Sequence, residues 1–164
     1  MDLHILKQKL NEEQPMVLEE FASQHQVNLE QILQALDCPM ISGALFDRIW
    51  HEIAEWRWVT LIVHTADGIW EWGGKLPTGT YRHGFFNLRS KEGLSGHIRF
   101  EHCAKIAFLK RQFMGSETAS VIFLNYQGQA MCKIFVGRDS HRQLLNEQLQ
   151  HFEQMQHYTI IEGE

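Results

Sequence analysis

From residue 57 onward, hydrophobic residues recur at every second position, and this period restricts the possible folds more than any other feature of the chain. It predicts β-strands, because successive side chains of a strand point to opposite faces. Turn signals such as Asp67-Gly68 and Gln127-Gly128 separate the segments at intervals of about ten residues, which favours antiparallel hairpins over βαβ units. The seven predicted strands are RWVTLIVH, GIWEWGG, TYRHGFFNL, LSGHIRF, AKIAFLKRQF, TASVIFLN and QAMCKIFV.

The segments on either side of the strands have helical patterns. Residues 1–40 contain three short helical segments, and in the third Asn28 and Gln31 have the spacing of a capping box. A fourth helix follows Ser42, and a final helix of about 18 residues is predicted to begin at Asp139 as its N-cap. The sequence therefore predicts an α+β fold with N-terminal helices, a mostly antiparallel β-sheet meander and a C-terminal helix.

Length and charge restrict the class of protein. Residues 1–164 suit a single domain, with 1–40 as a helical N-terminal subregion. A net charge of −5 argues against a general nucleic-acid binder, and the third helix carries Glu30 but no Arg or Lys that could read bases. We interpret the subregion as a packing or dimer element. With no secretory signal and no long apolar run, we expect a cytoplasmic protein without a membrane partner.

One strand has two faces that both contain hydrophobic residues. In RWVTLIVH, the face of Val59 and Leu61 is assigned to the core. The other face is still partly apolar, although the outer face of a solvated antiparallel sheet is normally polar. It includes Trp58, Ile62 and His64. We therefore expect a second subunit, a loop or a flat apolar ligand to cover part of this face.

The segment LSGHIRF places a second histidine on a polar strand face. His97 alternates with the apolar residues, and Gly96 leaves room beside it. If His64 and His97 reached a common space, their imidazoles could bind iron or another metal, and an apolar surround would suit haem. Spacing alone favours the simpler interpretation of two polar residues on a solvated sheet, because histidines so far apart form no motif.

Other segments give weaker indications. The chain has no H-E-x-x-H, P-loop or G-x-S-x-G motif. His83 could orient a ligand or cap a turn. Phe113 and Met114 could close over a flat ligand, although methionine more often fills a core.

Four stretches of the chain resemble one known family, and they are VHTAD (63–67), GKLPTGTYRHGFFNLRSKEGLSGHI (74–98), FMGSETASVIFLN (113–125) and AMCKIFVGRDSHRQLL (130–145). The family is the HutX/ChuX family of intracellular haem-utilisation proteins. The resemblance covers residues 42–156, and the N-terminal helices more loosely. It implies a fold like one half of the larger HemS/ChuS-type haem-degrading proteins, and a homodimer with clefts for haem. The implied function is a cytoplasmic haem carrier in iron acquisition that passes haem to a partner haem-degrading enzyme.

The resemblance also implies functional residues. The family's haem-contacting histidines correspond to His64 and His97, which are therefore the candidate iron ligands. Arg99 could meet a haem propionate from the strand face of His97, and Arg89 and Lys133 are further candidates. Two alternatives to the carrier stay open, namely a haem-degrading enzyme that releases iron and a haem-responsive regulator.

Overall fold

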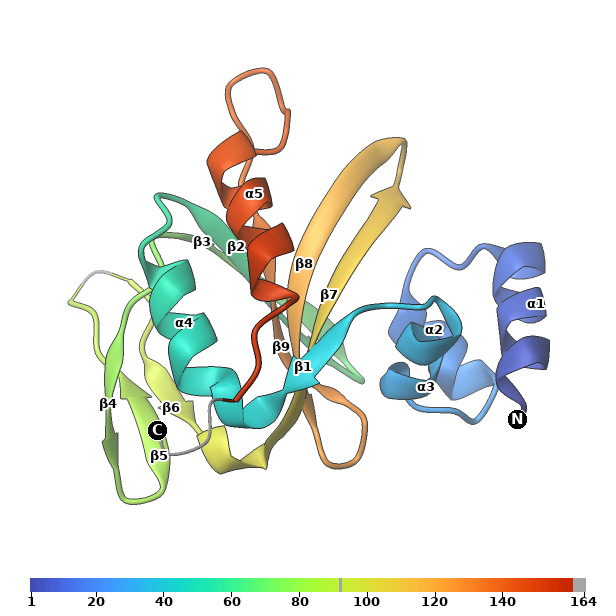
Figure 1. Cartoon of the computed structure of the whole chain (residues 1–164), viewed down its shortest axis with the longest axis horizontal. Coiled ribbons are helices and arrows are strands. Elements are labelled where there is room, and N and C mark those ends of the chain that lie inside the picture. Colours follow the sequence, from blue (N-terminus) through green and yellow to red (C-terminus); the bar gives the residue numbers. More distant parts are fainter. Residues whose placement is uncertain (92, 161–164) are drawn as a thin grey trace.

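The computed structural model describes residues 1–91 and 93–160 of the 164-residue chain (Figure 1). Its larger sheet has six strands in the order β1-β7-β8-β9-β2-β3, and a second sheet has the order β4-β5-β6. Every strand pair in these two sheets is antiparallel, which confirms the predicted sheet type. The strands are β1 Met40–Ser42, β2 Val59–Thr65, β3 Gly68–Gly74, β4 Gly79–Arg82, β5 Phe85–Leu88, β6 Gly96–Ile98, β7 Cys103–Phe113, β8 Ser116–Asn125 and β9 Ala130–Val136.

The helices lie on opposite sides of the larger sheet, with the N-terminal three on one side and the other two on the other (Figure 1). Asn28 and Gln31 form the predicted capping box at the start of α3. The Ser42 hydroxyl accepts a hydrogen bond from Ala44 N at 3.2 Å and caps the 3-10 turn that leads into α4. The helices are α1 Leu3–Glu13, α2 Leu18–Gln24, α3 Leu29–Ala35, α4 Phe46–Ala54 and α5 Asn146–Met155.

The first hydrophobic core joins both sheets to α4 and α5. Trp50 of α4 is completely buried, and its ring lies 5.7 Å from that of Phe86 in β5 and 5.8 Å from that of Phe123 in β8. Val59 and Leu61 point into this core, as their alternation predicts. The smaller sheet is thus held against the larger one through the aromatic residues of α4.

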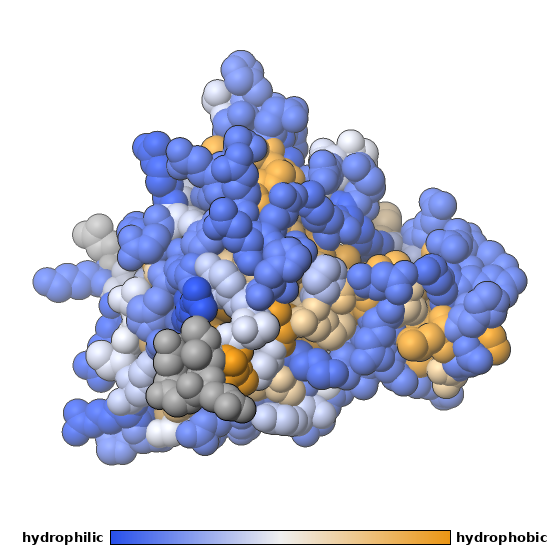
Figure 2. Space-filling model, in the orientation of Figure 1, coloured by the Kyte–Doolittle hydropathy of each residue, from blue (hydrophilic) through white to orange (hydrophobic). Residues whose placement is uncertain are grey.

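A second core lies on the opposite face of the larger sheet. There, α1, α2 and α3 pack on Ala107, Ile122 and Leu124. Part of the face that we expected to be covered is therefore covered by the chain's own N-terminal helices, which act as a packing element. Hydrophobic residues also remain at the surface of this subregion, as Figure 2 shows, and Leu3 and Ile5 of α1 are about half exposed.

Three predicted elements were wrong in their extent, and β1 was not predicted. LSGHIRF contains only the three-residue strand β6, because a 3-10 turn begins at Phe100. TYRHGFFNL is a hairpin and not a single strand, because His83 and Gly84 both have positive φ and make a two-residue turn between β4 and β5. The C-terminal helix begins at Asn146 and is shorter than predicted. Asp139 is not its N-cap, because its carboxylate accepts hydrogen bonds from His141 N and Gln143 N within the preceding loop.

The end of α4 is tied to the C-terminal segment by a network of polar side chains. One oxygen of Glu52 accepts hydrogen bonds from His151 Nε2 and Tyr158 Oη, each at 2.6 Å, and the other accepts from Arg48 Nε at 3.0 Å. Trp56 donates to His151 Nδ1 at 2.9 Å, so His151 Nε2 carries the proton that is donated to Glu52. Burial by itself raises the pKa of Glu52, but the hydrogen bonds from Tyr158, His151 and Arg48 lower it below 4.5 overall.

We expect Glu52→Gln to lower the free energy of unfolding by about 1–3 kcal/mol at pH 7, because it removes a hydrogen-bonded charge. A lowered pKa in the folded state stabilises the protein above the unfolded-state pKa, and this contribution is lost as pH falls through the folded-state value. The difference from the parent chain should therefore narrow below about pH 4.5. Urea unfolding at pH 7 and at acidic pH measures the difference in the free energy of unfolding between Glu52→Gln and the parent chain. Glu55→Gln is the control, because Glu55 is exposed. An equal loss at both pH values would contradict the prediction.

Candidate functional site

A groove of about 650 Å³ lies on the second face of the larger sheet, beside the N-terminal helices. Alternate residues of β2, namely Thr60, Ile62 and His64, point into it because their neighbours point into the first core. Strands β3, β7, β8 and β9 complete the floor, and residues 16–19 at the start of α2 form a wall. The groove is the part of this face that the N-terminal helices leave uncovered.

The floor of the groove is largely apolar. Ile62, Leu109 and Phe135 line it and are half-buried. Trp58 lies at the rim and is 54% exposed. Its indole occupies the space next to Gly73, and a Cβ atom at residue 73 would come within 2.9 Å of it. A glycine at residue 73 therefore leaves the space that this indole occupies.

Four cationic side chains and two acidic ones also line the groove. Lys133 forms an ion pair with Glu19 of α2, and both side chains are largely buried. Arg111 donates to the carbonyls of Pro15 and Met16 and so ties the α1–α2 connection to β7. Burial lowers the pKa of Arg111, and the charge of Glu19 opposes that shift. Lys133 thus has a charged partner in the protein, whereas Arg111 has backbone carbonyls as acceptors.

The remaining two cations, Arg138 and Arg142, lie in the loop after β9. Arg138 donates to the carbonyls of Arg142 and Glu117, which holds its guanidinium at the groove. No pattern in the sequence indicated Arg111, Arg138 or Arg142 as site residues. Arg138 and Arg142 lie within one of the stretches that carry the family resemblance. The side chains of loop residues follow no periodicity, however, so the sequence does not show which way they point.

The two candidate iron ligands do not reach a common space within one chain. His64 lies in β2, is half-buried and lines the groove. His97 lies in β6 of the smaller sheet, is exposed and does not line the groove. The expected room beside His97 is present, because a Cβ built on Gly96 meets no atom within 4 Å.

The other predicted residues divide between the two sheets. Phe113 lines the groove at the end of β7, whereas Met114 is 78% exposed in the β7–β8 turn and borders a neighbouring hollow. His83 forms the exposed β4–β5 turn, and Arg89 is exposed after β5. Arg99 stacks on Phe85 of the smaller sheet, with 4.3 Å between the guanidinium carbon and the ring centroid.

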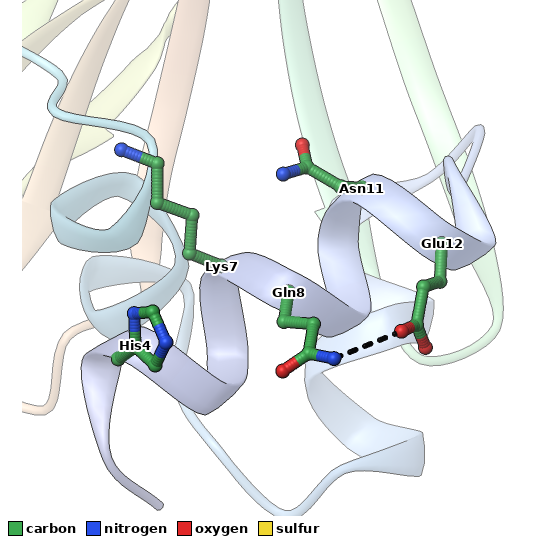
Figure 3. Close-up of a pocket in the computed structure, with 5 residues that line it drawn as sticks. All are labelled: His4, Lys7, Gln8, Asn11 and Glu12. Carbon is green, nitrogen blue, oxygen red and sulfur yellow. Dashed lines mark hydrogen bonds between the residues drawn. The ribbon is translucent and has the colours of Figure 1, made fainter.

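A second hollow runs along α1 and is formed by one face of that helix (Figure 3). Gln8 donates to Glu12 at 3.2 Å, a hydrogen bond between neighbouring turns of a solvated helix. The other side chains drawn, those of His4, Lys7 and Asn11, do not converge on a common point. This hollow is therefore not a candidate site.

Comparisons with known proteins agree with the resemblance. A family model described as haem utilisation ChuX/HutX matches residues 40–155. The chain is 34% identical over 153 residues to the intracellular heme transport protein HutX of Vibrio cholerae serotype O1, an alignment that covers 90% of this chain and 79% of that protein. Its structure matches that of the heme binding protein ChuX with a TM-score of 0.83 and 46% identity, over 92% of this chain and 96% of the other.

The structure also matches half of a larger protein. The E. coli heme oxygenase ChuS has a TM-score of 0.73 and 13% identity, with 96% of this chain matched to 49% of that one. At such low identity the match concerns the fold alone, and it confirms the predicted half of a ChuS-type architecture. From the family model and the HutX and ChuX matches together, we conclude that this chain belongs to the HutX/ChuX family of haem-utilisation proteins.

Proposed function

We propose that this protein is a cytoplasmic haem carrier that serves iron acquisition by passing haem to a partner haem-degrading enzyme. The groove is the observation that carries the proposal. Its volume of about 650 Å³ lies within the ~300–1,000 Å³ typical of small-molecule pockets. An apolar floor suits a porphyrin face, His64 offers a nitrogen ligand, and Arg138 and Arg142 offer charges for propionates.

The relatives support a carrier over the two alternatives. The V. cholerae protein is named a heme transport protein and ChuX a heme binding protein, and neither name describes an enzyme or a regulator. The likeness to a heme oxygenase is one of fold, which does not by itself imply the same activity.

We propose as haem-contacting residues those that the family resemblance implies, with His64 and His97 as the two candidates for the iron ligand. In the structure Lys133 forms an ion pair with Glu19, so Lys133 can contact a haem propionate only if that ion pair breaks. The remaining proposed contacts are His83, Arg89, Arg99, Phe113 and Met114.

Titration of the purified protein with hemin tests the function. We expect a Soret shift that saturates with the parent chain, and weaker binding with His64→Ala and with His97→Ala, because each removes a candidate ligand. His157→Ala is the matched control, since His157 is exposed near the C-terminus. A featureless titration of the parent chain would refute the carrier, and unchanged binding by both variants would refute the ligand assignment.

We also propose a homodimer. Its support in this chain is β3, which is an edge strand of the larger sheet and exposes Ile69 and Trp70 by 50% and 70%. Exposed edge strands with large hydrophobic side chains tend to pair with another chain.

We expect the parent chain to sediment at twice its mass of 19.2 kDa, and Trp70→Lys to shift it toward the monomer. Tyr126→Lys is the control, because Tyr126 is equally exposed but lies in the β8–β9 turn. Sedimentation velocity measures both variants, and a monomeric parent chain would disprove the dimer.

A further inference from the structure

Asn87 lies at the centre of the smaller sheet, directly across from His97 in the strand register. The amide oxygen Oδ1 of Asn87 is 2.6 Å from His97 Nδ1. This hydrogen bond gives His97 a fixed partner on one side of its ring.

The orientation of the Asn87 amide is determined by its surroundings. Its nitrogen Nδ2 is 3.0 Å from the carbonyl oxygen of Thr80, 3.2 Å from that of Arg82 and 3.2 Å from that of Phe85. All three are acceptors, so the amide group that faces them must be the NH₂ donor. The group that faces His97 is therefore the oxygen.

An amide oxygen only accepts hydrogen bonds, so His97 Nδ1 must carry a proton. The neutral ring then has a bare lone pair on Nε2, the form in which imidazole binds iron. Histidines that ligate metals commonly donate their other N–H to a carbonyl or carboxylate in this manner.

The surroundings of His97 leave that lone pair accessible. The ring packs edge-on against Phe85, with 5.8 Å between centroids, and the side chain is exposed. His64 differs, because within residues 1–91 and 93–160 no hydrogen bond from its ring to another protein group is found. Only one of the two candidate ligands thus has its tautomer set by the protein.

We propose that Asn87 is a positioning residue that holds His97 as the Nδ1–H tautomer and directs Nε2 toward the haem iron. His97, and not His64, is then the histidine whose tautomer in the haem-free protein is already the one that binds iron. The inference rests on the proposed haem binding for its purpose, but the tautomer itself is a property of the apoprotein. Because His97 does not line the groove of its own chain, the inference agrees with the groove as the haem site only if His97 of the second copy in the proposed homodimer reaches the haem there.

Long-range ¹H–¹⁵N NMR of the haem-free protein at pH 8 tests the tautomer. We expect His97 to show a protonated Nδ1 and a bare Nε2 in the parent chain. Asn87→Ala should lose this preference, whereas Asn87→Asp should keep it because a carboxylate still accepts from Nδ1. A protonated Nε2 in the parent chain, or an unchanged His97 signal in Asn87→Ala, would overturn the proposal. Circular dichroism checks that the variants are folded.

Hemin binding tests the consequence. We expect resonance Raman spectra to show an iron–imidazole bond that His97→Ala removes and His64→Ala retains. Asn87→Ala should weaken hemin binding about tenfold, the loss typical of a missing partner to a ligating histidine, and Asn87→Asp should restore much of it. If hemin does not bind the parent chain, the proposed function fails although the NMR result stands. If hemin binds and His97→Ala leaves the spectrum unchanged, this inference fails and the carrier function stands.

Discussion

Trp50→Ala is expected to lower the free energy of unfolding by about 3–5 kcal/mol, the loss typical of a large aromatic residue removed from a core. Trp50 is completely buried, and it contacts aromatic rings of both sheets. Its indole N–H also donates to the carbonyl of Pro77 at 2.9 Å, and alanine leaves that acceptor without its donor. The substitution thus removes the packing that joins the smaller sheet to the larger one.

Urea unfolding followed by circular dichroism measures this loss without relying on tryptophan fluorescence. The chain provides a matched control in Trp70, which is 70% exposed on β3. For Trp70→Ala we expect a change within about 0.5 kcal/mol, as for surface substitutions in general, measured at a protein concentration below that of any dimer. Comparable losses for Trp50→Ala and Trp70→Ala would show that the two sheets are not joined through Trp50.

Thr60→Trp is expected to weaken hemin binding at least tenfold, which corresponds to about 1.4 kcal/mol or more. Thr60 points into the groove from the middle of β2, between Gly73 of β3 and Phe135 of β9. An indole at this position would occupy the apolar floor that we assign to the porphyrin. The first core lies on the other face of the strand, so the fold should persist.

A hemin titration with Soret detection measures this effect, and Thr159→Trp serves as control because Thr159 is exposed beyond α5 and does not line the groove. Full hemin affinity in a folded Thr60→Trp protein would exclude the groove as the haem site. The proposed carrier would then need a different surface, such as the face of the smaller sheet around His97.

Several local features of the fold follow from the sequence because their causes are local. The capping box of Asn28 and Gln31 was predictable from spacing, since its hydrogen bonds join residues three apart. The division of β2 into a core face and a second face followed from the alternation of side chains. The turn at His83-Gly84 was missed, because His-Gly is not one of the residue pairs that commonly signal a two-residue hairpin turn.

The functional residues were predictable only in part. The family resemblance named both histidines, but no pattern indicated that they lie in different sheets. The ion pair between Lys133 and Glu19 joins residues far apart in the chain and depends on where α2 packs. The hydrogen bond between Asn87 and His97 required the register of β5 and β6.

The sequence by itself determined most of the strands and helices and which side chains share a strand face, because periodicity and capping depend on neighbouring residues. Only the tertiary structure decided what covers each face. The N-terminal helices cover one part of the second sheet face through Ala107, Ile122 and Leu124, and the groove with His64 is the part left uncovered. The physical reason is that burial depends on contacts between residues distant in the chain, and a pattern along the chain gives the face of a side chain but not the partner of that face.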